Sequence, residues 1–234
     1  MTDLTGRIAL VTGANRGLGA AFVAGLLERG VAKVYAAARR PETVTSDDPR
    51  VVPLALDVTD PESIRRAAEV ASDVTVLVNN AGIAVNQSLV SGDLDEIHRE
   101  FDTNFWGPVL VTRAFAPVLA QNDGGAIVNM HSALSWLALG SYSATKAALW
   151  SASNSARVEL APQGIQVVGV HVGYVDTEMA ANAEGVKVPP AQVVDEALDA
   201  VLSGDAEAIV GDVARQVKSK LHEDVRALYP QLAK

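Results

Sequence analysis

The chain has 234 residues, of which 49% are hydrophobic and 20% charged, and its formal net charge at pH 7 is −9. This composition excludes a disordered chain, because disorder goes with low hydrophobicity and high net charge, and the length suits one domain or at most two small ones. The acidic surplus repels phosphate backbones and anionic lipid headgroups, which disfavours nucleic acid and membrane surfaces as partners.

The sequence contains no cysteine, which excludes disulfides, thiolate nucleophiles and cysteine-based metal sites. The four histidines lack metal-ligand spacing, so no metal site is expected. The first residues show neither the basic nor the apolar segment of a signal peptide, and no apolar run approaches the ~18 residues of a membrane span. We therefore expect a cytoplasmic protein that binds no membrane and no nucleic acid.

Short apolar runs typical of buried strands alternate with stretches of helical spacing along the whole chain. We predict strands over residues 8–11, 34–37, 51–56, 74–78, 127–130, 167–172 and 208–210. Helices are predicted between them, over residues 18–28, 61–70, 93–119, 142–160, 191–202 and 212–228. This alternation predicts one doubly wound α/β domain over residues 1–234, with about seven mostly parallel strands flanked by helices.

A glycine-rich loop, Thr12–Gly19, follows the first predicted strand and opens a helix. Gly13 allows a tight turn, Gly17 lets the backbone approach a pyrophosphate, and Gly19 lets the helix pack closely on the sheet. The amides and the dipole at the helix start then attract phosphate. The alternative is a tight turn without a ligand. We predict a dinucleotide site that includes Gly13, Asn15, Arg16, Gly17, Leu18 and Gly19.

Two arginines stand where the second predicted strand ends. A site for NAD places an acidic side chain there, about 20 residues after the glycine loop, to bind the ribose hydroxyls. This chain has Ala38-Arg39-Arg40 instead. Arginine binds the 2′-phosphate that a carboxylate would repel, so Arg39, with Arg16, predicts NADP(H) in preference to NAD(H). The alternative is a pair of solvated surface arginines.

Polar or small residues also follow the third and fourth predicted strands. In a doubly wound sheet ligands bind at the carboxyl ends of the strands. The cofactor site is therefore expected to include Asp57, Val58, Asn80, Ala81 and Gly82. Asp57 could accept a hydrogen bond from an adenine amine, although a turn aspartate is equally consistent, and an Asx turn is the alternative for the asparagines.

A serine, a tyrosine and a lysine follow in chain order. Ser132 ends the fifth predicted strand, and Tyr142 and Lys146 share one helix face at i and i+4. A nearby ammonium group lowers the pKa of a phenol from about 10, so Tyr142 is predicted to act as an acid or base near neutral pH. Ser132 would donate a hydrogen bond to the same substrate oxygen. Such Tyr and Lys pairs are common on ordinary helices, and their position after the glycine loop distinguishes this one.

Together, the glycine loop, Asn79–Gly82, Ser132, Tyr142 and Lys146 resemble the signature of the short-chain dehydrogenase/reductase family. The resemblance covers essentially the whole chain and implies a Rossmann fold that transfers a hydride between NAD(P) and a carbonyl or alcohol carbon. It also implies that Tyr142 is the acid/base, that Ser132 polarises the substrate oxygen, and that Lys146 tunes Tyr142 and binds the nicotinamide ribose.

Further positions follow from the resemblance alone. Asn104 matches the fourth catalytic position, in a distorted helix, and Val175 and Thr177 match contacts to the nicotinamide amide. Residues of about 178–190 match a short substrate lid. Family members commonly form homodimers or homotetramers through the helices predicted over 93–119 and 142–160.

The chain departs from the family pattern in two places. Val172 stands where the family has a proline before Gly173, and the interval between Ser132 and Tyr142 is short. The apolar pocket candidates suggest a small hydrophobic substrate; they are Val85, Leu134, Trp136, Leu137 and Met179. We predict an NADP(H)-dependent oxidoreductase that reduces a ketone or aldehyde or oxidises the matching alcohol. The alternative is a non-catalytic dinucleotide-binding sensor or scaffold on the same fold.

Overall fold

Seven parallel strands form the central sheet of the computed structural model, which describes residues 3–232. The strand order is β3-β2-β1-β4-β5-β6-β9, and each neighbouring pair is parallel. The bounds are β1 (Ile8–Thr12), β2 (Lys33–Ala38), β3 (Val51–Ala55), β4 (Val76–Asn79), β5 (Gly125–Met130), β6 (Ile165–Val172) and β9 (Glu207–Val210). The doubly wound prediction is confirmed, and the strand order reverses between β1 and β4.

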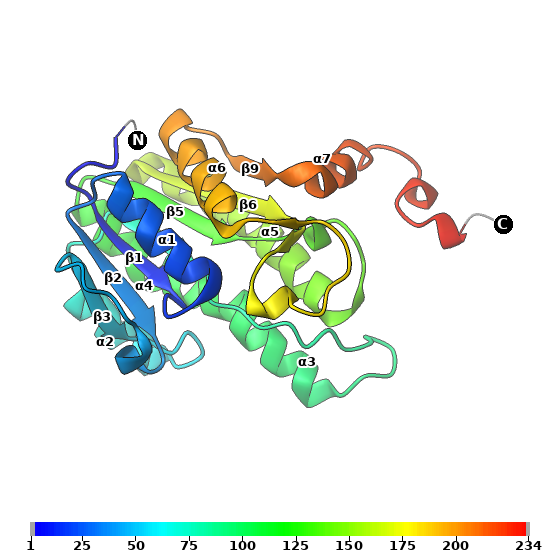
Figure 1. The fold of residues 1–234 in the computed structure, drawn as a ribbon, viewed down its shortest axis with the longest axis horizontal. Helices are drawn as coiled ribbons and strands as arrows, with labels where there is room; N and C mark the ends of the chain where they lie inside the picture. Colours follow the sequence, from blue (N-terminus) through cyan, green and yellow to red (C-terminus); the bar gives the residue numbers. More distant parts are fainter. Residues whose placement is uncertain (1–2, 233–234) are drawn as a thin grey trace.

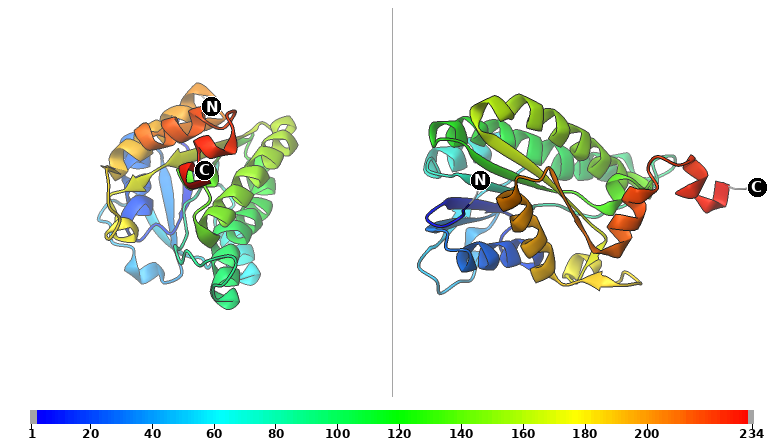
Figure 2. Two further views of the ribbon diagram at one scale, coloured as in Figure 1. Left: turned by 90° about the vertical axis from the view of Figure 1, so that its right-hand side faces the viewer. Right: turned by 90° about the horizontal axis from the view of Figure 1, so that it is seen from above.

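Helices cover both faces of the sheet, giving three layers (Figure 1; Figure 2, left). One face packs against α1 (Gly17–Glu28) and α6 (Pro190–Ser203). The other face packs against α2 (Pro61–Val70), α4 (Gly107–Gln121) and α5 (Gly140–Leu160). Successive strand residues point to opposite faces, so Leu10 belongs to the second core and Val11 to the first. Because both faces are covered, most strand residues are apolar.

The segment predicted as one helix over residues 93–119 consists of three pieces. It contains α3 (Leu94–Phe101), one turn of π-helix (Asp102–Trp106) and α4. The distorted turn contains Asn104, as the family resemblance implied. A π-turn places an extra residue between hydrogen-bonded partners and commonly occurs at functional sites.

The helix predicted over residues 212–228 is shorter than expected. α7 (Gly211–Ser219) ends before the polar segment His222–Asp224, whose side chains are exposed. Asp224 then accepts a hydrogen bond from Arg226 N and starts a separate 3₁₀ turn. Without an apolar face to pack, this segment has no reason to continue the helix, and it projects from the body of the molecule (Figures 1 and 2).

The segment predicted as a lid has little helix. One 3₁₀ turn (Glu178–Ala180) follows β7 (Tyr174–Val175), which pairs in parallel with β8 (Lys187–Val188). No helix within residues 3–232 is both long and apolar enough to cross a bilayer. Across the same residues, no three histidine or acidic side chains gather in a way that could hold a metal ion.

Candidate active site

The glycine loop lies at the point where the strand order reverses. Gly13 and Gly17 have φ values of +65° and +53°, which side chains other than glycine rarely adopt. A Cβ on Gly19 would lie 2.1 Å from the carbonyl oxygen of Gly13. The backbone of α1 therefore approaches the end of β1 more closely than any other residue type would allow, which fits the three glycine roles expected from the sequence.

Asn80 supports this loop through its side chain. Its Nδ2 donates to Thr12 O at 2.9 Å, and its backbone N donates to Thr12 Oγ1 at 3.0 Å. Ala81 N donates to the same hydroxyl, also at 3.0 Å. Thr12, which the sequence did not single out, thus joins the ends of β1 and β4. The Nδ2 group of Asn80 is therefore engaged by the glycine loop itself.

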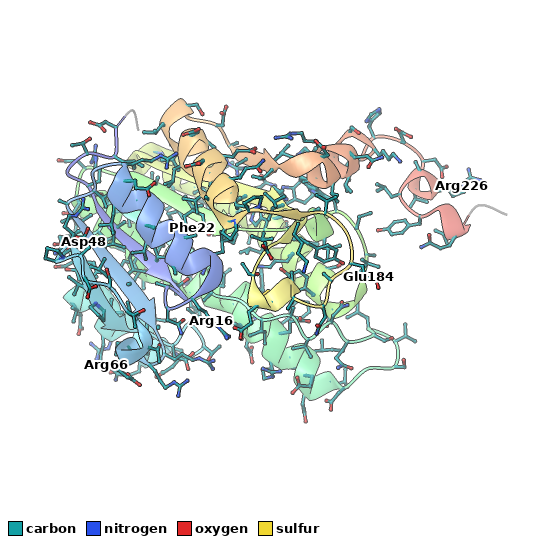
Figure 3. All side chains as sticks on the ribbon, viewed as in Figure 1. Arg16, Phe22, Asp48, Arg66, Glu184 and Arg226 are labelled. Carbon is teal, nitrogen blue, oxygen red and sulfur yellow. The ribbon has the colours of Figure 1, made fainter. Side chains whose placement is uncertain are left out.

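The start of α1 is open to an anion. The Arg16 side chain does not cap the helix, its first turn contains no acidic residue, and Gly17 is exposed. Free amides at a helix N-terminus attract phosphate. Arg16 forms an ion pair with Glu178, with 2.6 Å between Nη1 and Oε2, and Figure 3 shows Arg16 projecting at this end of α1. Arg39 is exposed directly after β2.

Asp57 takes part in a turn. Its Oδ1 accepts hydrogen bonds from Thr59 N at 2.9 Å and Thr59 Oγ1 at 2.7 Å, as the turn alternative described. Val58 is buried, and a Cβ on Gly107 would lie 3.0 Å from its Cγ2. Val58 therefore packs the segment after β3 against the start of α4. This segment lies at the carboxyl end of β3, where the sequence predicted part of the cofactor site.

The side chains of Lys146 and Tyr142 lie beside the end of β5. The Lys146 side chain is buried, and its Nζ donates to Met130 O at 2.8 Å. The same Nζ lies 5.6 Å from the centroid of the Tyr142 ring. Ser132 follows Met130 by two residues, so the first turns of α5 and the end of β5 bring the predicted serine, tyrosine and lysine to one edge of the sheet.

Asn104 fixes the segment after β4. Its Oδ1 accepts from Ile83 N at 2.9 Å, and its Nδ2 donates to Ile83 O at 2.8 Å. A Cβ on Gly82 would lie 3.2 Å from Asn104 Oδ1 and 3.9 Å from Lys146 Nζ. Gly82, Asn104 and Lys146 therefore converge, although they are far apart in the sequence.

The pKa values of the tyrosine and lysine differ from the sequence-based prediction. Burial raises the pKa of Tyr142 to about 12, and the negative charge of Glu100 adds to this effect. Burial lowers the pKa of Lys146 to about 8. The sequence predicted a lowered pKa for Tyr142, whereas in the protein alone this pKa is raised, because desolvation of the phenolate is the largest effect. Tyr142 is therefore protonated at neutral pH and suited to donate a proton.

Glu100 is a functional candidate that the sequence did not reveal. Its buried carboxylate accepts hydrogen bonds from Val85 N at 2.6 Å, Asn86 N at 3.2 Å and Ser141 Oγ at 2.5 Å. It thereby joins the loop after β4 to the first turn of α5, beside Tyr142. In the sequence it lies in a run of polar helix residues, and no local signal distinguishes it from its neighbours.

The hydroxyl of Ser132 donates only one long hydrogen bond. It accepts from Leu134 N at 3.1 Å and donates to Val172 O at 3.4 Å. A donor–acceptor distance of 3.4 Å is long for a hydroxyl hydrogen bond, so the proton of Ser132 is readily available to another acceptor. Val172, which replaces the usual proline, supplies this carbonyl.

The remaining predicted positions lie around this edge. A Cβ on Gly17 would lie 3.6 Å from Thr177 Cγ2, which places Thr177 over the glycine loop, and Val175 is partly buried in β7. Among the apolar pocket candidates, Trp136 is buried against His171 and is not exposed to a ligand in this structure. The others are partly or fully exposed: Val85, Leu134, Leu137 and Met179.

A parallel sheet with a glycine loop at its switch point defines a dinucleotide-binding α/β protein. Residues 7–187 match the family model described as short chain dehydrogenase. The chain therefore belongs to the short chain dehydrogenase family of oxidoreductases, which confirms the resemblance stated from the sequence.

Individual proteins similar to this chain are also short-chain dehydrogenases or reductases. The structure is similar to that of a short chain dehydrogenase from Burkholderia cenocepacia J2315 in complex with NADP, with a TM-score of 0.94, 40% identity and 100% coverage of both chains. The short-chain dehydrogenase/reductase GME11361 of Pestalotiopsis microspora is 30% identical over 97% of this chain and 82% of its own length. The NADPH-dependent 1-acyldihydroxyacetone phosphate reductase of Schizosaccharomyces pombe is 32% identical over 76% of this chain and 63% of its own length.

Proposed function

We propose that this protein is an NADP(H)-dependent oxidoreductase that reduces a ketone or aldehyde, with Tyr142 as the proton donor. The observation that carries the proposal is the convergence of Tyr142, Lys146 and Asn104 beside the glycine loop, at the carboxyl edge of the sheet. NADPH, when bound, would supply a hydride to the carbonyl carbon.

The residues at this edge fit the cofactor. The close approach of Gly19 to Gly13 and the uncapped start of α1 form a cradle for a pyrophosphate. Arg39 and Arg16 would bind the 2′-phosphate, while Val175 and Thr177 would contact the nicotinamide amide. The NADP bound to the Burkholderia cenocepacia relative supports this preference.

Four residues would each have a different part in the proton transfer. Tyr142 is protonated at neutral pH because burial raises the pKa of its phenol, and it would donate this proton to the carbonyl oxygen. Ser132 would exchange its long hydrogen bond with Val172 O for one to the same oxygen and stabilise its developing charge. Lys146, buried beside the phenol, would favour the phenolate left after transfer and bind the nicotinamide ribose. The main-chain carbonyl of Asn104 would hold a water that resupplies the proton.

Two exposed apolar side chains lie in the segments that flank the proposed substrate site. We propose that the segment over about 178–190 is a short lid and that the substrate is a small hydrophobic carbonyl compound or alcohol. Met179 in this segment and Leu139 in the short loop before α5 are both exposed, and they would cover an apolar ligand. Assembly into a homodimer or homotetramer through α4 and α5 is part of the same proposal.

The experiment that tests the proposal is the Tyr142→Phe variant. Without the phenol proton, we expect kcat for a reducible ketone to fall by about 10³-fold, within the range typical of general acid catalysis. NADPH binding, measured by fluorescence, should stay near the wild-type value. Tyr174→Phe, which removes an exposed hydroxyl from β7, is the control and should retain activity.

Two outcomes would contradict the proposal. Turnover that persists in Tyr142→Phe would exclude Tyr142 as the proton donor. A wild-type protein that binds NADPH but consumes none against a broad panel of ketones and aldehydes would favour the sensor or scaffold alternative.

A further inference from the structure

A chain of buried hydrogen bonds leads from the sheet to Ser132. Asn129 Nδ2 donates to Ser153 Oγ at 2.8 Å, and Ser153 Oγ lies 2.9 Å from His131 Nε2. His131 Nδ1 lies 3.0 Å from His171 Nε2, and His171 Nδ1 lies 3.2 Å from the main-chain oxygen of Ser132. All five residues are buried, and neither histidine has a part in the proposed proton transfer.

The partners of the two rings determine where their protons lie. The Ser132 carbonyl oxygen only accepts, so His171 Nδ1 must carry a proton. A neutral ring has one such proton, so His171 Nε2 then accepts from His131 Nδ1. His131 Nε2 then accepts from the hydroxyl of Ser153, which accepts a hydrogen bond from Asn129 Nδ2 and turns away from its other acceptor, Leu149 O at 2.8 Å. Every link is satisfied when all protons point toward Ser132.

The charges around the pair favour this neutral arrangement. Glu207 Oε1 lies 3.5 Å from His171 Nε2, whereas the Glu207 carboxylate accepts from Lys218 Nζ at 2.6 Å and Trp150 Nε1 at 2.7 Å. Lys218 therefore lies closer to the Glu207 carboxylate than His171 does. Burial lowers the pKa of His131 well below its usual range, and the positive charges of Lys146 and Arg157 also disfavour a protonated His131.

Packing holds both rings in place. The Trp136 ring stacks on His171, with 4.0 Å between centroids and 12° between planes. A Cβ on Gly169 would lie 2.5 Å from Cε1 of His131, so glycine in β6 makes room for this ring. Trp136 belongs to the short loop between Ser132 and Tyr142, and His171 therefore contacts both the start and the middle of that loop.

We propose that His171, oriented by His131, is a positioning residue that fixes the main chain of Ser132, and with it the serine hydroxyl, at the end of β5. The inference rests on the proposed role of Ser132. The hydroxyl itself has only a long bond to Val172 O, so its direction toward a substrate depends on how firmly the backbone of Ser132 is held. Small displacements of a catalytic group reduce the rate strongly.

Nitrogen NMR of the histidine rings tests the proton arrangement directly. The chain has four histidines, and His98 and His222 are exposed, so their signals serve as internal references. We expect neutral Nδ1–H rings for both His131 and His171 at pH 7. An Nε2–H ring, or a doubly protonated ring, at His171 would overturn the proposal. This measurement needs no catalysis, so its result is separate from the fate of the proposed function.

Variants test the effect on the reaction. His171→Leu removes the donor to Ser132, and we expect kcat to fall by about tenfold to a hundredfold while NADPH affinity is unchanged. His171→Asn keeps an N–H group near the Nδ1 position and should recover most of the lost rate. Gly169→Ala removes no hydrogen-bonding group but displaces His131, and it should also lower kcat selectively.

Wild-type kcat in folded His171→Leu and Gly169→Ala would refute the positioning role. A fall in kcat that His171→Asn does not rescue would also count against it, because the effect would then come from packing alone. If His171→Leu does not fold, Gly169→Ala and the NMR measurement still decide the question.

Discussion

Arg16 of the glycine loop and Glu178 of the segment after β7 form an exposed ion pair, with 2.6 Å between Nη1 and Oε2. The pair joins the proposed phosphate site to the proposed lid. A cofactor phosphate that takes Arg16 would have to displace Glu178 from it. Ion pairs this exposed are weak, so the competition is expected to be small but measurable.

Glu178→Gln should strengthen NADPH binding by about two- to fivefold, because Arg16 then has no carboxylate partner to leave. The measurement is NADPH fluorescence titration. Glu184→Gln, on the same exposed segment (Figure 3), is the matched control and should bind as the wild type does. Equal effects in both variants would mean that only the net charge of the segment matters.

Arg39→Asp should reverse the cofactor preference. The variant loses a charge-assisted contact and places a carboxylate beside the 2′-phosphate, so kcat/KM with NADPH should fall by about 10- to 100-fold. With NADH it should hold or rise. The same change at Arg66, on the exposed side of α2, controls for net charge. An unchanged ratio of the two cofactors, or a wild type that prefers NADH, would be incompatible with the assignment of Arg39.

Glu100→Gln should change the pH dependence of alcohol oxidation. After burial, the negative charge of Glu100 is the second cause that raises the pKa of Tyr142, so its removal should lower that pKa. In the proposed mechanism Tyr142 is the base for oxidation, so the acid limb of the kcat profile should move to lower pH. Ser141→Ala removes a hydrogen bond from Glu100 but not its charge, and its profile should keep the wild-type position. A shift in both variants would assign the effect to loop geometry.

Lys146→Met should reduce the pH dependence of stability. The pKa of Lys146 is about 8 in the folded protein and 10.5 in the reference state, so the unfolded chain binds more protons between these values. The free energy of unfolding of the wild type should therefore rise with pH in this window, by up to about 3 kcal/mol.

Denaturant unfolding at about pH 7 and about pH 9.5 measures most of this difference, and at the higher pH only a minor part of Tyr142 is ionised in the unfolded chain. The variant should be more stable relative to the wild type at the lower pH, and more than half of this advantage should be lost at the higher pH. Lys220→Met, after the end of α7, is the control and should follow the wild type. If the free energy of unfolding varies with pH in the same way for Lys146→Met and the wild type, the pKa of Lys146 is not lowered by burial.

Local pattern predicted the fold because strands buried on both faces read as apolar runs and the helices between them keep a period of 3.6 residues. The last predicted helix is shorter than expected, because Leu221 and Val225 in this segment are exposed and have no core to pack against. Periodicity records an apolar face; it does not record whether another element covers that face.

The sequence by itself determined the seven-stranded order of elements, the glycine loop and the candidates Ser132, Tyr142 and Lys146, because these are matters of residue type and spacing along the chain. Only the tertiary structure showed that burial raises the pKa of Tyr142, that Glu100 accepts a hydrogen bond from Ser141, and that His171 contacts the main chain of Ser132. Desolvation and hydrogen bonds between residues some 40 positions apart depend on how the chain packs, and linear spacing carries no record of them.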